Sequence, residues 1–150
     1  QADNVIQIRS PNSVRPWQHV LEPLYGYLVL AEANFHLETN WNGGWNFGPH
    51  QSSAITVREI IDYLITERTL PLEIKEDLTS KFHEEILLYV DSSKASSELA
   101  VKSVWDIKNT LERTVDWYLT QKQGADMRDF TITQIDEYLA KQSMEFFKNV

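Results

Sequence analysis

The stretch from residue 13 to residue 28, SVRPWQHVLEPLYGYL, constrains the fold more than any other part of the chain. Pro16 fixes its own φ and pushes Arg15 toward extended backbone. After this turn, apolar residues recur at helical spacing at positions 21, 24, 28, 31 and 35, which predicts a helix from Leu21 to about Leu37. Pro23 falls in the first turn, where its missing N–H loses no partner. Further apolar residues cover most of the circumference, so we expect this helix to be buried on several sides, with Leu28 in the core.

Short apolar or alternating runs predict a few strands. Alternation with β-branched residues indicates a strand over residues 4–9. Residues 45–48 and 86–90 indicate two more short strands, the second of a buried type. Residues 72–74 are a weaker candidate.

Capping patterns place the other helices. Thr56 and Glu59 are spaced as a capping box at the start of an amphipathic helix, and Asp106 is placed to cap a longer one. Thr131 and Gln134 form a second such pattern, which predicts that the last helix opens there. We expect that helix to turn one apolar side inward: Ile132, Ile135 and Leu139. The fold class that follows is α+β, helix-rich, with a few short strands and no Rossmann sheet in this chain.

Composition narrows the possible functions. A chain of 150 residues with 42% hydrophobic residues can bury a real core. It has no cysteine, which excludes disulfides, thiolate metal sites and cysteine nucleophiles, and we expect a cytoplasmic protein. The net charge of −8 disfavours nucleic acid or an anionic membrane as a partner. A local group of cations such as Arg9, Arg15 and His19 still suits a small anionic ligand.

A series of motifs along the chain resembles one enzyme family. RPWQHVLEPLYGYL at residues 15–28 is followed in order by WNFGP at 45–49, DSSKA at 91–95, TVDWY at 114–118 and QIDEY at 134–138. Together they resemble the carboxy-terminal part of CDP-glucose 4,6-dehydratases, nucleotide-sugar enzymes among the extended short-chain dehydrogenases/reductases of the NAD-dependent epimerase/dehydratase type. The first motif is the most specific, and the shared order supports it.

The resemblance implies a single nucleotide-sugar-binding domain over residues 1–150, part of a longer enzyme whose NAD-binding Rossmann domain precedes residue 1. Such enzymes oxidise the sugar C4 hydroxyl with NAD, eliminate water across C5 and C6, and return the hydride to C6. The products are 4-keto-6-deoxy sugars that serve surface polysaccharides. The parent is expected to be a homo-oligomer, and this chain alone is expected to be inactive.

The resemblance also implies the binding residues. Arg15 occupies the place of the family's arginine that contacts the nucleotide diphosphate, and a guanidinium can do so through two parallel hydrogen bonds. Gln18, His19 and Glu84 are secondary candidates for the CDP-sugar, with Glu84 accepting hydrogen bonds from the ribose or the cytosine amino group. The alternative interpretation is a solvated surface arginine for Arg15 and a solvated acidic turn for Glu84.

Other sequence patterns give little support for a cofactor, metal or catalytic site in this chain. The chain has no glycine-rich dinucleotide loop, and the histidines and carboxylates lack metal-ligand spacing. Tyr118 and Lys122 match a Tyr-x-x-x-Lys pair, but they fall in the TVDWY helix and not in the family's catalytic helix, so we reject them as catalytic. The tryptophans are more typical of core residues than of residues that stack on a sugar. For Trp17, both roles remain open.

Two features limit the resemblance. Relatives have a Leu-Gly-Trp-x-Pro run where this chain reads Leu99-Ala100-Val101-Lys102-Ser103-Val104, so the turn there is expected to differ. The sequence does not determine which base and sugar the enzyme recognises, so one alternative is a sibling epimerase or dehydratase of other base specificity. A second alternative is a non-catalytic helical interaction module.

Overall fold

The structure is a computed structural model that describes residues 5–36, 41–76 and 85–148. The chain divides into two compact units, the first formed by residues 1–16 and 54–89 and the second by residues 17–53 and 90–150. Each unit is described by itself. Within the described residues, no helix is long and apolar enough to cross a membrane.

The first unit contains two small sheets. Strand β1, Val5–Ile8, pairs in parallel with β4, Glu73–Glu76, so that Ile6 lies opposite Ile74. Strand β2, Val14–Pro16, pairs antiparallel with β3, Ala54–Thr56. The predicted strand over residues 4–9 is therefore confirmed at Val5–Ile8, and the weaker candidate at 72–74 is a strand displaced to 73–76.

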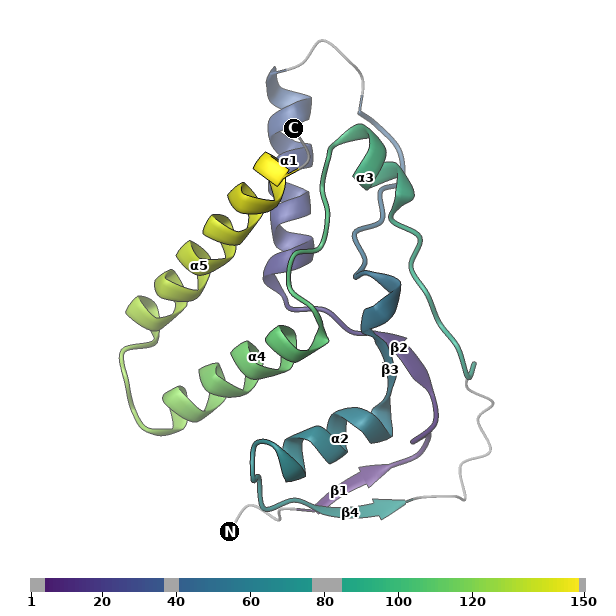
Figure 1. The fold of residues 1–150 in the computed structure, drawn as a ribbon, viewed down its shortest axis with the longest axis vertical. Helices are drawn as coiled ribbons and strands as arrows, with labels where there is room; N and C mark the ends of the chain where they lie inside the picture. The colour runs from purple at the N-terminus through teal and green to yellow at the C-terminus, as the bar shows by residue number, and fades with distance from the viewer. Residues whose placement is uncertain (1–4, 37–40, 77–84, 149–150) are drawn as a thin grey trace. The chain divides into compact units, whose positions relative to one another are not determined.

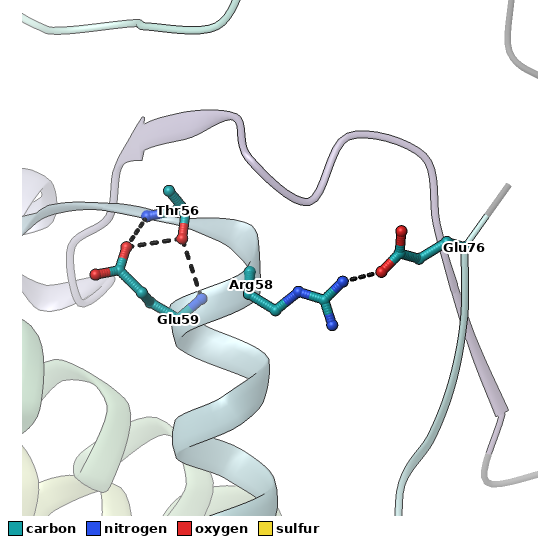
Figure 2. A network of polar contacts seen from close by, with 4 residues as sticks. All are labelled: Thr56, Arg58, Glu59 and Glu76. Carbon is teal, nitrogen blue, oxygen red and sulfur yellow. Dashed lines mark hydrogen bonds and ion pairs between the residues drawn. The ribbon is translucent and has the colours of Figure 1, made fainter. Parts of the chain in front are cut away.

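Helix α2, Val57–Thr66, starts at the predicted capping box. Figure 2 shows the reciprocal bonds: Thr56 Oγ1 accepts from the Glu59 backbone N–H at 3.1 Å, and Glu59 Oε2 accepts from the Thr56 backbone N–H at 2.7 Å. Arg58 forms an ion pair with Glu76, which ties α2 to β4 (Figure 2). Ile60 and Ile61 are buried and form the core of this unit together with Ile8.

The predicted buried strand at 86–90 is wrong. Only an isolated bridge joins Leu87 to Val14, and the side chains from Ile86 to Val90 are exposed. Strand β2 ends at Pro16, which has no N–H to donate, so the ladder cannot continue along it.

The second unit is helical. It contains α1, Leu21–His36; a short 3-10 turn, η1, at Gln51–Ser53; α3, Ser93–Glu98; α4, Ile107–Lys122; and α5, Met127–Lys148. Helices α4 and α5 form an antiparallel hairpin (Figure 1), held by an ion pair from Arg113 Nη1 to Glu137 Oε2 at 2.7 Å. Asp106 caps α4, as predicted, by accepting from the Asn109 backbone N–H at 2.8 Å.

The predicted span of α1 is confirmed as far as His36, but the prediction that it is buried on several sides is wrong. Its buried residues are Glu22, Gly26 and Ala33, whereas Leu28 is 71% exposed. Helical periodicity correctly identified an apolar stripe, but this stripe does not face the core of the unit.

The predicted strand at 45–48 is also wrong, because its backbone groups bond to side chains in place of a neighbouring strand. The Phe47 carbonyl accepts from Gln18 Nε2 at 2.9 Å, and the Gly48 N–H donates to Ser92 Oγ at 2.6 Å. The segment has no ladder in the part of the chain that the structure describes.

The last helix begins earlier than the capping pattern at Thr131 predicted. Asp126 Oδ1 accepts from the Arg128 N–H at 2.9 Å, and the helix starts between these two residues. Thr131 and Gln134 lie inside α5 and bond to α4: Thr131 Oγ1 accepts from Trp117 Nε1, and Gln134 Nε2 donates to the Arg113 carbonyl. The predicted inward set of α5 is exposed, and the buried residues are Gln134 and Tyr138.

The α+β prediction is confirmed. Helices dominate, and the sheets of the described residues are two-stranded, without the parallel Rossmann sheet of a dinucleotide-binding domain.

Candidate substrate-binding site

Arg15 lies in β2 of the first unit, in the extended backbone that Pro16 predicts. Its Nη1 donates to the carbonyl oxygens of Val14 and Glu85, each at 2.9 Å. These bonds hold the half-buried guanidinium in one orientation.

Gln18 and His19 lie in the second unit, in the turn that leads into α1. Gln18 Nε2 donates to the Phe47 carbonyl, and His19 Nδ1 accepts from the Leu21 backbone N–H at 3.3 Å. Both side chains therefore have a fixed orientation. Glu84, the remaining sequence candidate, lies outside the described residues.

The structure brings Gln18 and His19 together at one cavity of about 440 Å³. The cavity lies between the start of α1 and the α4–α5 hairpin. Its lining includes an indole, a phenol, two carboxamides and two threonine hydroxyls: Gln18, His19, Val20, Leu21, Thr114, Trp117, Tyr118, Thr131 and Gln134. The described lining residues include no carboxylate, lysine or arginine, so this lining suits an uncharged ring with polar edges better than an anion.

His19 adds no positive charge to this cavity at neutral pH. Burial, with the nearby Arg113 cation as a smaller cause, lowers the pKa of His19 to about 4. Because Nδ1 accepts a hydrogen bond from Leu21, the neutral ring carries its proton on Nε2. His19 is thus a neutral group at pH 7 and not a member of the cation group expected from the sequence.

A buried carboxylate next to the cavity was missed in the sequence. Glu22 accepts from the Trp105 N–H and the Tyr138 hydroxyl, both at 2.8 Å, and from the Val104 N–H at 3.1 Å. Burial raises the pKa of Glu22, and these hydrogen bonds act in the opposite direction. The carboxylate joins the first turn of α1 to the segment before α4 and to α5. An acid in the first turn of α1, followed by a largely apolar run from Pro23 to Ala31, was the available signal.

Aromatic contacts continue this network. The His19 ring meets Trp105 edge to face at 4.8 Å, and Trp105 meets Tyr138 at 5.1 Å. Tyr138 in turn meets Tyr25 of α1 at 5.8 Å. The wall of the cavity that carries His19 is therefore supported by packed rings, a rigid arrangement of the kind binding sites need.

Three of the recognised motifs pack against one another in the second unit. The Phe47 ring lies against Gly26 so closely that a Cβ at Gly26 would stand 2.3 Å from Phe47 Cδ1. Gly48 is bonded to Ser92, and Lys94 Nζ lies 3.8 Å from the centroid of the Trp45 ring. The part of the first motif that lies in this unit, residues 17–28, thus packs on residues 45–49, which in turn pack on residues 91–95.

The cavity residues of α4 and α5 were assigned no binding role from sequence. The sequence favours a core position for Trp117 and no catalytic role for Tyr118. The structure places both at the cavity lining, with Tyr118 63% exposed. Amphipathic spacing distinguishes an inner face from an outer one, but not a core position from a cavity wall.

The described residues contain neither a metal-ligand group nor a dinucleotide-binding loop. In the described ranges, no group of three histidine, aspartate or glutamate side chains is placed to hold a metal ion. The chain's five glycines, at positions 26, 43, 44, 48 and 124, form no pyrophosphate loop between a strand and a helix.

No family model matches this chain. A curated protein from Salmonella typhimurium strain LT2, CDP-glucose 4,6-dehydratase, is 38% identical to it over 133 residues. The match covers 89% of this chain and 37% of the relative, so the chain spans little more than a third of that protein's length. This confirms the resemblance that the motifs indicate.

Proposed function

We propose that this chain is the carboxy-terminal, substrate-binding part of a CDP-glucose 4,6-dehydratase, a single domain over residues 1–150. The observation that supports it most is the 38% identity over 89% of the chain. The parent enzyme would convert CDP-glucose to CDP-4-keto-6-deoxyglucose in the cytoplasm, as a homo-oligomer. NAD, bound by the amino-terminal Rossmann part outside this chain, would supply hydride acceptance from C4 and its return to C6.

In this proposal the chain binds and orients the substrate. Arg15 contacts the diphosphate, because a guanidinium matches two phosphate oxygens with parallel, charge-assisted bonds. Gln18 and His19 contact an uncharged part of the CDP-sugar, which agrees with the neutral lining of their cavity. Glu84 accepts from the ribose or the cytosine amino group.

The test is Arg15→Lys in the full-length parent. A lysine cannot form the bidentate contact, so we expect CDP-glucose to bind at least about tenfold more weakly, which corresponds to about 1.4 kcal/mol. Calorimetric titration of CDP-glucose and of NAD, separately, gives both affinities, and the affinity for NAD should stay unchanged. Titration of UDP-glucose into the wild type compares the two bases and so tests the sibling alternative.

Arg128→Lys is the matched control, because Arg128 is an exposed arginine to which no binding role is assigned. Since Arg15 also bonds to two carbonyls, the thermal midpoint of each variant must be measured. If a folded Arg15→Lys variant binds CDP-glucose as tightly as the wild type, Arg15 is a structural arginine and the assignment fails.

A further inference from the structure

Helix α1 is amphipathic in an unusual sense, because its larger apolar side chains face away from its own unit. Glu22, Gly26 and Ala33 are buried, whereas Leu28 and Phe35 are 71% and 83% exposed. At 3.6 residues per turn, the two sets lie on nearly opposite sides of the helix. Scattered exposed leucines are ordinary, but a continuous apolar line along a helix marks a surface that another element covers.

The spacing indicates what kind of element that is. The apolar line, here called the α1 stripe, consists of Leu21, Leu24, Leu28, Ala31 and Phe35. Successive members are separated by three, four, three and four residues, which is the a/d spacing of helices that pack side by side. Apart from the half-buried Leu21, every member is exposed, and the stripe contains no charged or hydrogen-bonding side chain. Its partner is therefore an apolar helix face.

We propose that the α1 stripe binds an apolar helix in the part of the parent enzyme that lies outside this chain. Almost two thirds of the relative's length lies outside the region that matches this chain, which is long enough to supply such a helix. The inference rests on the proposed function in that it takes the chain to be part of that longer protein. A second copy of this chain, or a segment of this chain itself, is a competing occupant.

Thiol accessibility tests the stripe directly, because the chain has no cysteine of its own. Leu28→Cys is compared in the isolated chain and in the full-length protein. Alkylation by iodoacetamide is followed at the modified peptide by mass spectrometry, so that other cysteines of the longer protein do not interfere. We expect rapid alkylation in the isolated chain and at least about tenfold slower alkylation in the full-length protein, since a buried thiol is shielded from the reagent.

Asn34→Cys is the matched control, because Asn34 is exposed on the same helix but away from the stripe. It should react quickly in both proteins. Ala31→Cys, a smaller change within the stripe, repeats the test if Leu28→Cys prevents the full-length protein from folding.

Three results would overturn the proposal. Equal rates at positions 28 and 34 in the full-length protein would mean that nothing covers the stripe. Slow reaction at position 28 in the isolated chain at all concentrations would place its cover within this chain, and protection lost on dilution would place it on a second copy. The alkylation measurement uses neither CDP-glucose nor NAD. The proposal for the α1 stripe can therefore fail while Arg15→Lys behaves as proposed, and it can hold while the Arg15 assignment fails.

Discussion

At the scale of single residues, Ala100 shows how a departure from the family pattern is accommodated. The resemblance leads us to expect a glycine after Leu99, but this chain has Ala100, which adopts a positive φ of 55°. The Leu99 and Val101 N–H groups both donate to the Ala95 carbonyl, so the turn that ends α3 is closed although an alanine occupies it. Ala100 is nevertheless a strained residue, because a Cβ disfavours left-handed backbone.

Ala100→Gly should stabilise the second unit by up to about 1 kcal/mol. Glycine removes a left-handed strain of about 1–2 kcal/mol, and the larger backbone entropy of the unfolded glycine variant offsets part of this gain. Urea unfolding of the wild type and the variant measures the difference. Ser97→Gly, at an exposed position inside α3, is the control and should destabilise. A lower midpoint for Ala100→Gly would show that the left-handed turn is not maintained in solution.

At the scale of elements, the contact between α1 and the segment at 41–50 explains why a helix keeps a glycine in its interior. Glycine costs a helix about 1 kcal/mol relative to alanine. Gly26 is nevertheless buried in the middle of α1, where the Phe47 ring occupies the space that a Cβ would need. The absent side chain lets the two segments approach closely.

Gly26→Ala should therefore destabilise the chain by about 1–3 kcal/mol, because overpacking outweighs the gain in helix propensity. Chemical unfolding measures this. Gly44→Ala is the control, since a Cβ there would meet no atom within 4 Å.

A double variant completes this test. Phe47→Ala removes all the ring atoms that would meet the new Cβ, so Gly26→Ala should cost less in that background than in the wild type. Purely additive effects would mean that the two residues do not touch.

At the scale of the whole molecule, two buried titratable groups give the folding free energy opposite pH dependences. Burial lowers the pKa of His19 to about 4, so the unfolded chain takes up a proton between pH 6.5 and 4 that the folded chain excludes. His19 therefore removes stability as the pH falls through this window. Burial raises the pKa of Glu22, so the contribution of Glu22 to stability is present at low pH and is lost as the pH rises through its folded pKa.

Comparison with a variant separates the two effects. The wild type should lose about 2 kcal/mol more than His19→Asn between pH 7 and pH 5, because only the wild type carries the His19 titration. Urea unfolding at both pH values gives the difference, and His36→Asn, a change at an exposed histidine, is the control. Parallel pH profiles for wild type and His19→Asn would show that His19 is not buried as the structure has it.

How much the sequence alone could predict depends on the range of the forces involved. The α1 span, the Thr56–Glu59 capping box and the Asp106 cap were predictable because each rests on hydrogen bonds and dihedral preferences within a few residues. The family resemblance also followed from the sequence, because it depends on residue identities in order. Of the candidate site, Gln18 and His19 were named beforehand, and the structure places them at one cavity.

Only the tertiary structure decided which face of each element is buried. Periodicity correctly located the apolar line on α1. The structure shows that this line faces away from its unit, because the buried residues of α1 are Glu22, Gly26 and Ala33. The strand predicted at 45–48 failed for a related reason, since a strand requires a partner and here Gln18 and Ser92 take its backbone groups. Burial and pairing are properties of two surfaces, and a local pattern carries information about only one of them.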